Sequence, residues 1–168
     1  MRSLSSIIRT KRCAALIALL LLNGCAIQLA PLYDQALVSG ITSANSETMQ
    51  LLASVSEGTD ANTFNTREDK YNKAIGDIDA LALQANARPV PSNDVESSVE
   101  KLFKQRATTA PSSIEPSYHA LQNISATLVE MRDTDKKQGL QPLEAQGFKN
   151  LIVSYMDDVL TYEDALQR

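Results

Sequence analysis

Apolar residues recur at steps of three and four along most of the chain, and this spacing places them on one face of an α-helix. Asp34, a good helix N-cap, precedes the first series, and Gly58 follows it where a left-handed C-terminal cap is expected. We therefore predict a first helix between these two residues. Its buried face is expected to comprise Leu37, Ile41, Ala44, Thr48, Leu51 and Val55.

A second series of apolar positions predicts another helix after the polar loop 58–65. Thr66 and Asp69 stand at the spacing of a capping box, which favours a helix start at this point. The two prolines within 88–93 resist helical structure and should end the helix. The predicted buried face comprises Tyr71, Ile75, Ile78, Ala82 and Ala85, with Leu81 beside it.

Three further helices are predicted in the second half of the chain. Asn93 and Glu96, at capping-box spacing, begin a short helix. The next helix should start near Pro116 and end at Gly139, and Pro142 opens the last one. The predicted apolar faces are Val95, Val99, Leu102 and Phe103 in the short helix, Tyr118, Leu121, Ile124, Leu128 and Met131 in the next, and Phe148, Ile152, Tyr155, Val159, Tyr162 and Leu166 in the last.

The overall pattern predicts an all-α fold. No stretch alternates apolar and polar residues in the manner of a β-strand. Long helices joined mostly by short connections pack side by side with neighbours in opposite directions. We therefore expect an antiparallel four-helix bundle, with the short extra helix lying between the second and fourth helices.

The beginning of the chain follows a different pattern. Residues 1–12 carry four basic side chains and no acidic one, and residues 13–22 are then apolar throughout. A membrane-spanning helix needs roughly 18 or more such residues, so this run is too short to cross a bilayer. A basic segment, an apolar core of about 7–15 residues and small residues at its end are typical of a secretory signal peptide. We predict a signal peptide at residues 1–24, since a buried N-terminal helix fits this order of charges less well.

The end of this segment, Leu22-Asn23-Gly24-Cys25, resembles the lipobox of bacterial lipoprotein precursors, with leucine three residues before the cysteine and a small residue directly before it. Asn23 departs from the small or aliphatic residue usual at its position, and cleavage without lipid attachment is the alternative. The resemblance implies that the Cys25 thiol receives diacylglycerol and that the chain is cut between Gly24 and Cys25. The new amine would then be acylated with a fatty acid such as palmitate.

The same resemblance implies an organisation and a location for the mature protein. Residues 25–33 would be the lipidated cysteine and its tether, and residues 34–168 the helical bundle domain. In such lipoproteins an aspartate directly after the cysteine favours retention in the inner membrane, whereas this chain has Ala26. The expected location is therefore the outer membrane, with the domain facing the periplasm.

Charge and cysteine content narrow the partners and the means of stabilisation. Loss of the four basic residues of the signal peptide leaves 12 Lys and Arg against 20 Asp and Glu, a net charge near −8. This balance argues against nucleic acid or anionic lipid headgroups as a main partner. Cys13 is lost with the signal peptide and Cys25 is blocked by lipid, so no disulfide can form. The bundle must then be held by packing.

Residues able to support catalysis or hold a metal are sparse. His119 is the only histidine, and Glu115 precedes it at the wrong spacing for a di-iron bundle. The chain has no Gly-x-Ser-x-Gly motif. Residues 131–139 resemble a calcium loop only superficially, because the glycine falls one residue late and lysines replace acidic ligands. We therefore expect no enzymatic activity, no metal and no cofactor, with His119 on the surface and 131–139 a frayed, charged helix end.

Two groups of residues are candidates for a binding role. Three tyrosines on apolar faces are expected either to reach water at the core edge or to line a cavity for a small ligand or metal. Four acidic residues near the C-terminus are expected on a solvated face, or alternatively form a patch for a basic partner. The tyrosines are Tyr71, Tyr118 and Tyr155, and the acidic residues are Asp157, Asp158, Glu163 and Asp164.

The sequence thus predicts a lipid-anchored periplasmic helical bundle that is not an enzyme and that binds a protein or another envelope component. The alternative is a bundle that binds a small ligand or metal through its tyrosine-lined interior.

Overall fold

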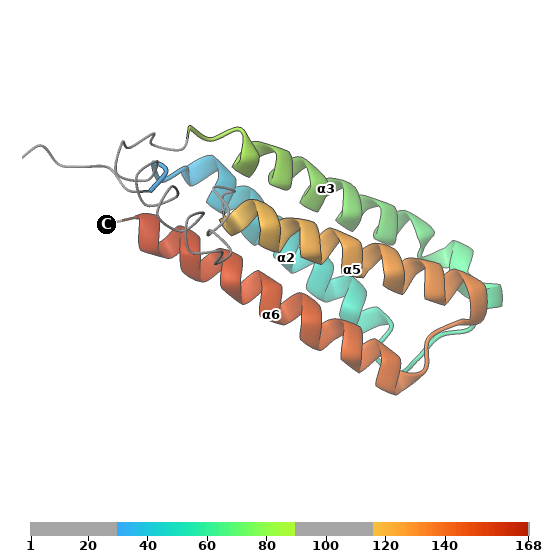
Figure 1. Ribbon diagram of the computed structural model, residues 1–168. Coiled ribbons are helices and arrows are strands. Elements are labelled where there is room, and N and C mark those ends of the chain that lie inside the picture. The colour runs from blue at the N-terminus through green and yellow to red at the C-terminus, as the bar shows by residue number, and fades with distance from the viewer. Residues whose placement is uncertain (1–29, 90–115, 168) are drawn as a thin grey trace, which may run out of the picture.

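The computed structural model describes residues 30–89 and 116–167, and these residues form a helical bundle (Figure 1). No β-strand occurs within these two ranges, which agrees with the predicted all-α fold. The signal peptide, Cys25 and the short helix predicted after Asn93 lie outside the described residues. The elements, in chain order, are α2 (Gln35–Ser54), the 3-10 helix η1 (Ala61–Thr66), α3 (Glu68–Asn86), α5 (Pro116–Gln138) and α6 (Pro142–Leu166).

Each α-helix packs against two of the other three. The contacts join α2 to α3, α3 to α5, α5 to α6, and α6 back to α2. The side chains of all four therefore meet in one central core. None of the described helices is both long enough and apolar enough to cross a membrane.

The helix ends gather at two poles of the bundle, at the left and right of Figure 1. We call one the terminal pole, because the described segments begin and end there, at residues 30–35, 86–89, 116–119 and 163–167. The other is the turn pole, formed by residues 55–67 and 138–142, which connect α2 to α3 and α5 to α6.

The predicted apolar faces of the first two long helices are confirmed, because every residue assigned to them is buried. In α5 the four aliphatic and methionine positions are buried as predicted, and Tyr118 is partly buried. The buried face of α6 is rotated from the prediction, since it is centred on Ile152, Met156 and Val159. The remaining predicted positions of α6 are only partly buried, namely Phe148, Tyr155, Tyr162 and Leu166.

The start of α2 confirms the predicted cap, because the Asp34 carboxylate accepts the backbone N–H groups of Ala36 and Leu37 at 2.9 and 3.1 Å. The helix ends at Ser54, earlier than predicted, and the chain then turns through Gly58 at a φ of 88°. This backbone conformation is the one that favours glycine.

The capping box predicted at Thr66 and Asp69 is wrong. Helix α3 begins at Glu68 with Arg67 at the N-cap, which makes no side-chain capping hydrogen bond. The reason is that the loop before it is helical: η1 is capped by Asp60, and the Thr66 hydroxyl donates to the Thr63 carbonyl within that turn.

The predicted end of one helix at Gly139 and the predicted start of the last helix at Pro142 are confirmed. Helix α5 begins at Pro116 in the described chain, and α6 begins at Pro142. Gly139 follows α5 with a φ of 77°, and the Glu144 carboxylate accepts the Gln141 N–H at 2.8 Å before α6. A Cβ at Gly139 would collide with the Thr59 carbonyl, so this glycine lets the two turns of the turn pole approach closely.

Candidate functional site

A buried ion pair joins the elements of the turn pole. The Asp135 side chain is fully buried, and it accepts hydrogen bonds from Arg67 Nε and Nη2, both at 2.5 Å. The Tyr71 hydroxyl donates to the same carboxylate at 3.1 Å, and the Thr59 hydroxyl donates to its other oxygen. Helix α5, helix α3 and the turn after α2 therefore meet at one carboxylate.

The Arg67 guanidinium has a partner for each of its five N–H donors. Besides the two bonds to Asp135, its Nη1 donates to the Thr63 carbonyl and hydroxyl at 3.2 and 2.8 Å. Its Nη2 also donates to the Asp60 carbonyl at 3.1 Å. The two charges neutralise one another inside the protein. Because Arg67 binds both Asp135 and the backbone of the loop, the cluster holds the loop 59–67 against α5.

The network changes the proton affinities of its members. Burial by itself would raise the pKa of the Asp135 carboxyl, but Arg67, Thr59 and Tyr71 outweigh it and hold that pKa below the usual value of 3.8. Burial raises the pKa of the Tyr71 phenol, and the neighbouring carboxylate raises it further. Near neutral pH the site therefore holds a carboxylate, a guanidinium and a neutral phenol.

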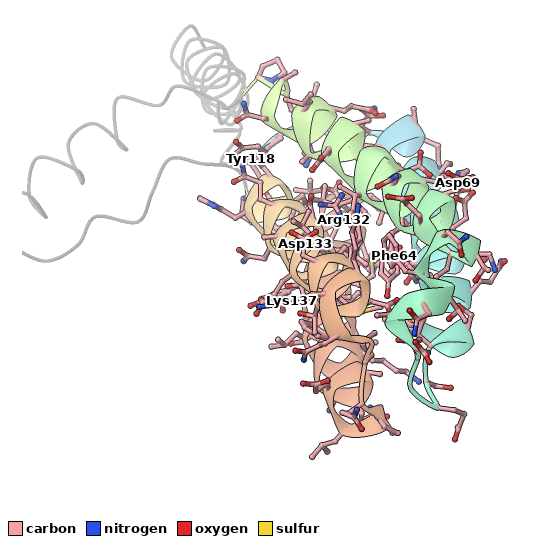
Figure 2. All side chains as sticks on the ribbon, turned by 90° about the vertical axis from the view of Figure 1, so that its right-hand side faces the viewer. Phe64, Asp69, Tyr118, Arg132, Asp133 and Lys137 are labelled. Atoms are coloured by element: carbon pink, nitrogen blue, oxygen red, sulfur yellow. The ribbon has the colours of Figure 1, made fainter. Side chains whose placement is uncertain are left out.

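The same cluster connects the two turns of the turn pole. The Thr59 N–H donates to the Leu140 carbonyl at 2.9 Å, and the Leu140 N–H donates to the Thr59 hydroxyl at 2.8 Å. Figure 2, seen from this side, shows Phe64 between α3 and α5, where its ring stacks on Tyr71 at 6.1 Å. The prediction that 131–139 is a frayed, charged end is therefore wrong, because α5 continues to Gln138 and Asp135 within it is buried and hydrogen-bonded.

A second buried ion pair lies at the terminal pole. Arg88 donates to the Glu163 carboxylate through Nη1 at 2.9 Å and Nη2 at 2.6 Å, and the Ser117 hydroxyl donates to the same carboxylate. Glu163 is 1% exposed. Its placement on a solvated acidic face is thus wrong, since it joins the ends of α3 and α6 to the start of α5. Asp157, Asp158 and Asp164 are exposed as predicted.

The terminal pole also carries a surface pocket of about 500 Å³, a volume in the range of small-ligand sites. Among the described residues its walls are formed by the start of α2 and by the segment that follows α3. They include Leu32, Tyr33, Ala36 and Pro89, together with the charged Asp34 and Arg88.

The three candidate tyrosines lie in different surroundings. Tyr71 is fully buried and its hydroxyl is bound to Asp135. Tyr118, at the start of α5, accepts a hydrogen bond from Gln122 at 2.7 Å. The 17 positions between Tyr118 and Asp135 correspond to about 26 Å along the helix, so Tyr71 and Tyr118 are not brought together. Tyr155 is partly buried against the core.

The other candidate catalytic or metal-binding side chains of the described residues do not gather into a site. His119 is exposed, as predicted, and its ring lies 5.8 Å from that of Tyr118. Within residues 30–89 and 116–167, no three His, Cys, Asp or Glu side chains are grouped closely enough to hold a metal ion.

Arg67, Asp135 and Arg88 were not identified from the sequence, and Glu163 was placed on a solvated face, although a signal for all four exists. Asp135 follows Met131 by four positions and Glu163 follows Val159 by four, so each extends an apolar series. Arg67 and Arg88 stand likewise four residues before Tyr71 and three after Ala85. A charged residue at a position that continues an apolar series is therefore a sign of a buried ion pair.

Comparisons with known proteins found no match to any family model, to any curated protein or to any solved structure. A function for this protein is therefore inferred from its own residues. The relevant residues are those of the lipobox-like segment before the bundle and those of the two buried ion pairs, one at each pole of the bundle.

Proposed function

We propose that this chain is the precursor of a lipoprotein that is anchored in the outer membrane through Cys25 and holds its helical domain in the periplasm. One observation carries the proposal: the sequence Leu22-Asn23-Gly24-Cys25 directly follows a basic segment and ten apolar residues. This order of charge, apolar length and cleavage residues is typical of exported precursors. A cysteine carrying two or more acyl chains provides a stable anchor where one chain does not.

The arrangement of the domain supports this proposal. Helix α2 begins at Gln35, only ten positions after Cys25, so a short tether would hold the bundle near the membrane. The described residues contain no cysteine. Two buried ion pairs, Arg67 with Asp135 and Arg88 with Glu163, join the helices. Because the described residues form no disulfide, acylation of the Cys25 thiol removes no contact that stabilises them.

The proposed architecture is an antiparallel four-helix bundle with a short additional helix between α3 and α5. Support for the antiparallel order comes from contacts between helix starts and helix ends. Gln84 near the end of α3 donates to Asp34 before α2, and Lys136 near the end of α5 pairs with Glu68 at the start of α3. Ser117 at the start of α5 likewise binds Glu163 near the end of α6.

The proposed role is to bind a protein or another envelope component, without catalysis. It is supported by the way in which the buried polar groups are engaged, since Arg67 and Asp135 bind one another and the Tyr71 hydroxyl is bound to the same carboxylate. Asp157 and Asp158 are exposed on α6 and present carboxylates to a basic partner. Recognition by a surface is therefore favoured over chemistry in the interior.

Labelling with palmitate tests the anchor in a bacterial host. Wild-type protein is expected to incorporate the label and to fractionate with the outer membrane. Cys25→Ser should lose both properties, whereas Cys13→Ser should keep both, because Cys13 lies within the segment that is removed. Equal labelling and equal membrane association of Cys25→Ser and wild type would overturn the proposal.

A further inference from the structure

We infer that the terminal pole rests on the lipid surface, with Leu32 and Tyr33 in contact with the membrane and the turn pole directed away from it. This inference depends on the lipid anchor proposed above. It goes further, because an anchored domain can in principle stand at any angle to the membrane on a flexible tether. The described residues favour one orientation through chain length, surface chemistry and charge.

The length of the tether limits which part of the domain reaches the membrane. Leu32 lies seven positions after Cys25, and seven steps along the chain span at most about 25 Å when fully extended. Helix α6 has 25 residues and is therefore about 37 Å long. The terminal pole is where the tether joins the bundle, so it stays close to the anchor, while the turn pole lies a full helix length beyond it.

The terminal pole has the side chains that suit a lipid interface. Leu32 is 74% exposed and lines the pocket beside Tyr33 and Pro89. Leu83 is 68% exposed and is adjacent in sequence to Gln84, whose side chain binds Asp34 at this pole. Tyrosine combines an apolar ring with a polar hydroxyl and is enriched at membrane interfaces.

The charged residues that line the pocket do not oppose this contact. The two charged residues that line the pocket are both engaged within the bundle, since Arg88 is paired with Glu163 and the Asp34 carboxylate accepts hydrogen bonds from Ala36, Leu37 and Gln84. Desolvation of a charge is unfavourable unless it is paired, so these contacts lower the penalty of bringing lipid to this pole. The partner is the apolar region of the interface and not an anionic headgroup.

Three exposed leucines allow a matched test along the length of the bundle. Leu32 lies at the terminal pole, Leu151 in the middle of α6, and Leu143 at the turn pole, where it is 84% exposed. The thiol of Cys25 is blocked in the lipidated protein and Cys13 is removed, so Leu32→Cys, Leu151→Cys and Leu143→Cys would each supply the only free thiol. Each variant is labelled with bimane and reconstituted in vesicles of phosphatidylethanolamine and phosphatidylglycerol that contain a nitroxide-labelled lipid.

We expect the nitroxide lipid to quench the label at position 32 several-fold more strongly than the label at 143, with 151 close to 143. Equal quenching at all three positions, stronger quenching at 151 or 143, or quenching at none would overturn the inference. Sedimentation of the same vesicles separates the two proposals. If the protein sediments with the vesicles but position 32 is not preferred, only the orientation is wrong. If it does not sediment with them, the anchor and the orientation fail together.

Discussion

At the scale of single residues, Asp135 is the side chain on which most of the turn pole depends. Its carboxylate is fully buried and accepts hydrogen bonds from Arg67, Thr59 and Tyr71. We expect Asp135→Asn to lower the free energy of unfolding at pH 7 by about 3–5 kcal/mol, because Arg67 would be left buried without a counter-charge. Urea denaturation followed by circular dichroism measures the change.

Asp133→Asn is the matched control for this substitution, since Asp133 is on the same helix with its side chain 61% exposed and paired to the adjacent Arg132. Such an exposed pair contributes between about 0 and 1 kcal/mol. If Asp135→Asn is as mild as Asp133→Asn, the network does not stabilise the turn pole as described.

The contribution of Asp135 also has a defined dependence on pH. Its pKa is lower in the folded protein than the ordinary value of 3.8 that applies to the unfolded chain. The ionised carboxylate therefore adds stability that is present above the unfolded pKa and lost as the pH falls through the folded pKa. The difference in unfolding free energy between wild type and Asp135→Asn should be constant from pH 7 to about pH 5 and shrink below about pH 4. A difference that grows on acidification would contradict the assignment.

Thr48 is a polar residue in a wholly apolar position. It is fully buried in α2, and its hydroxyl has no hydrogen-bond partner within the described chain. Thr48→Val keeps the shape of the side chain and removes the unpaired hydroxyl, so we expect the free energy of unfolding to rise by about 1 kcal/mol. Thr127→Val is the control, because the Thr127 hydroxyl donates to the Asn123 carbonyl at 2.7 Å and should give no comparable gain. Thermal unfolding compares the two, and a destabilised Thr48→Val would contradict the prediction.

At the scale of the helices, two glycines inside helices have opposite environments. At Gly76 in α3 a Cβ would have no atom within 4 Å apart from its chain neighbours and its own helix backbone, whereas at Gly40 in α2 it would be 2.6 Å from Leu81 Cδ2. Gly76→Ala should therefore raise the free energy of unfolding by about 1 kcal/mol through helix propensity alone. Gly40→Ala must displace Leu81 and should gain less or lose stability. Equal gains for the two variants, measured by urea denaturation, would show that α2 and α3 are not in close contact there.

The helices were the most predictable part of the molecule, because their signals are local. Apolar spacing and the cap at Asp34 act within one or two turns, so the faces of α2 and α3 could be assigned residue by residue. The start of α3 could not, because η1 uses the Thr66 hydroxyl that a capping box would have required. A local signal fails where a neighbouring element competes for the same group.

The two ion pairs could not be assigned because their partners are distant in the chain. Arg67 and Asp135 are 68 positions apart, and Arg88 and Glu163 are 75 apart. Which charges meet is decided by the packing of helices whose separate patterns do not specify their neighbours. In the sequence, each acidic residue only continues an apolar series. This spacing indicates that the acid is buried, but it does not indicate which arginine pairs with it.

At the scale of the whole molecule, the bundle has two ends with different construction. The turn pole is tied by the Arg67–Asp135 network and by the hydrogen bonds between Thr59 and Leu140. The terminal pole is held by the Arg88–Glu163 ion pair, but it also has the pocket beside Leu32 and is the end nearest to Cys25 along the chain. A lipid anchor at Cys25 would thus place the turn pole away from the membrane, where the Arg67–Asp135 network holds its loops in place.

The intact mass of the protein, extracted from bacterial membranes with detergent, tests the lipid anchor most directly. We predict a main species that consists of residues 25–168 with a diacylglyceryl group on the Cys25 thiol and an acyl chain on its amine. Cys25→Ser should instead keep its signal peptide and carry no lipid. A wild-type mass equal to the unmodified chain of 168 residues, or to residues 25–168 without lipid, would contradict the account.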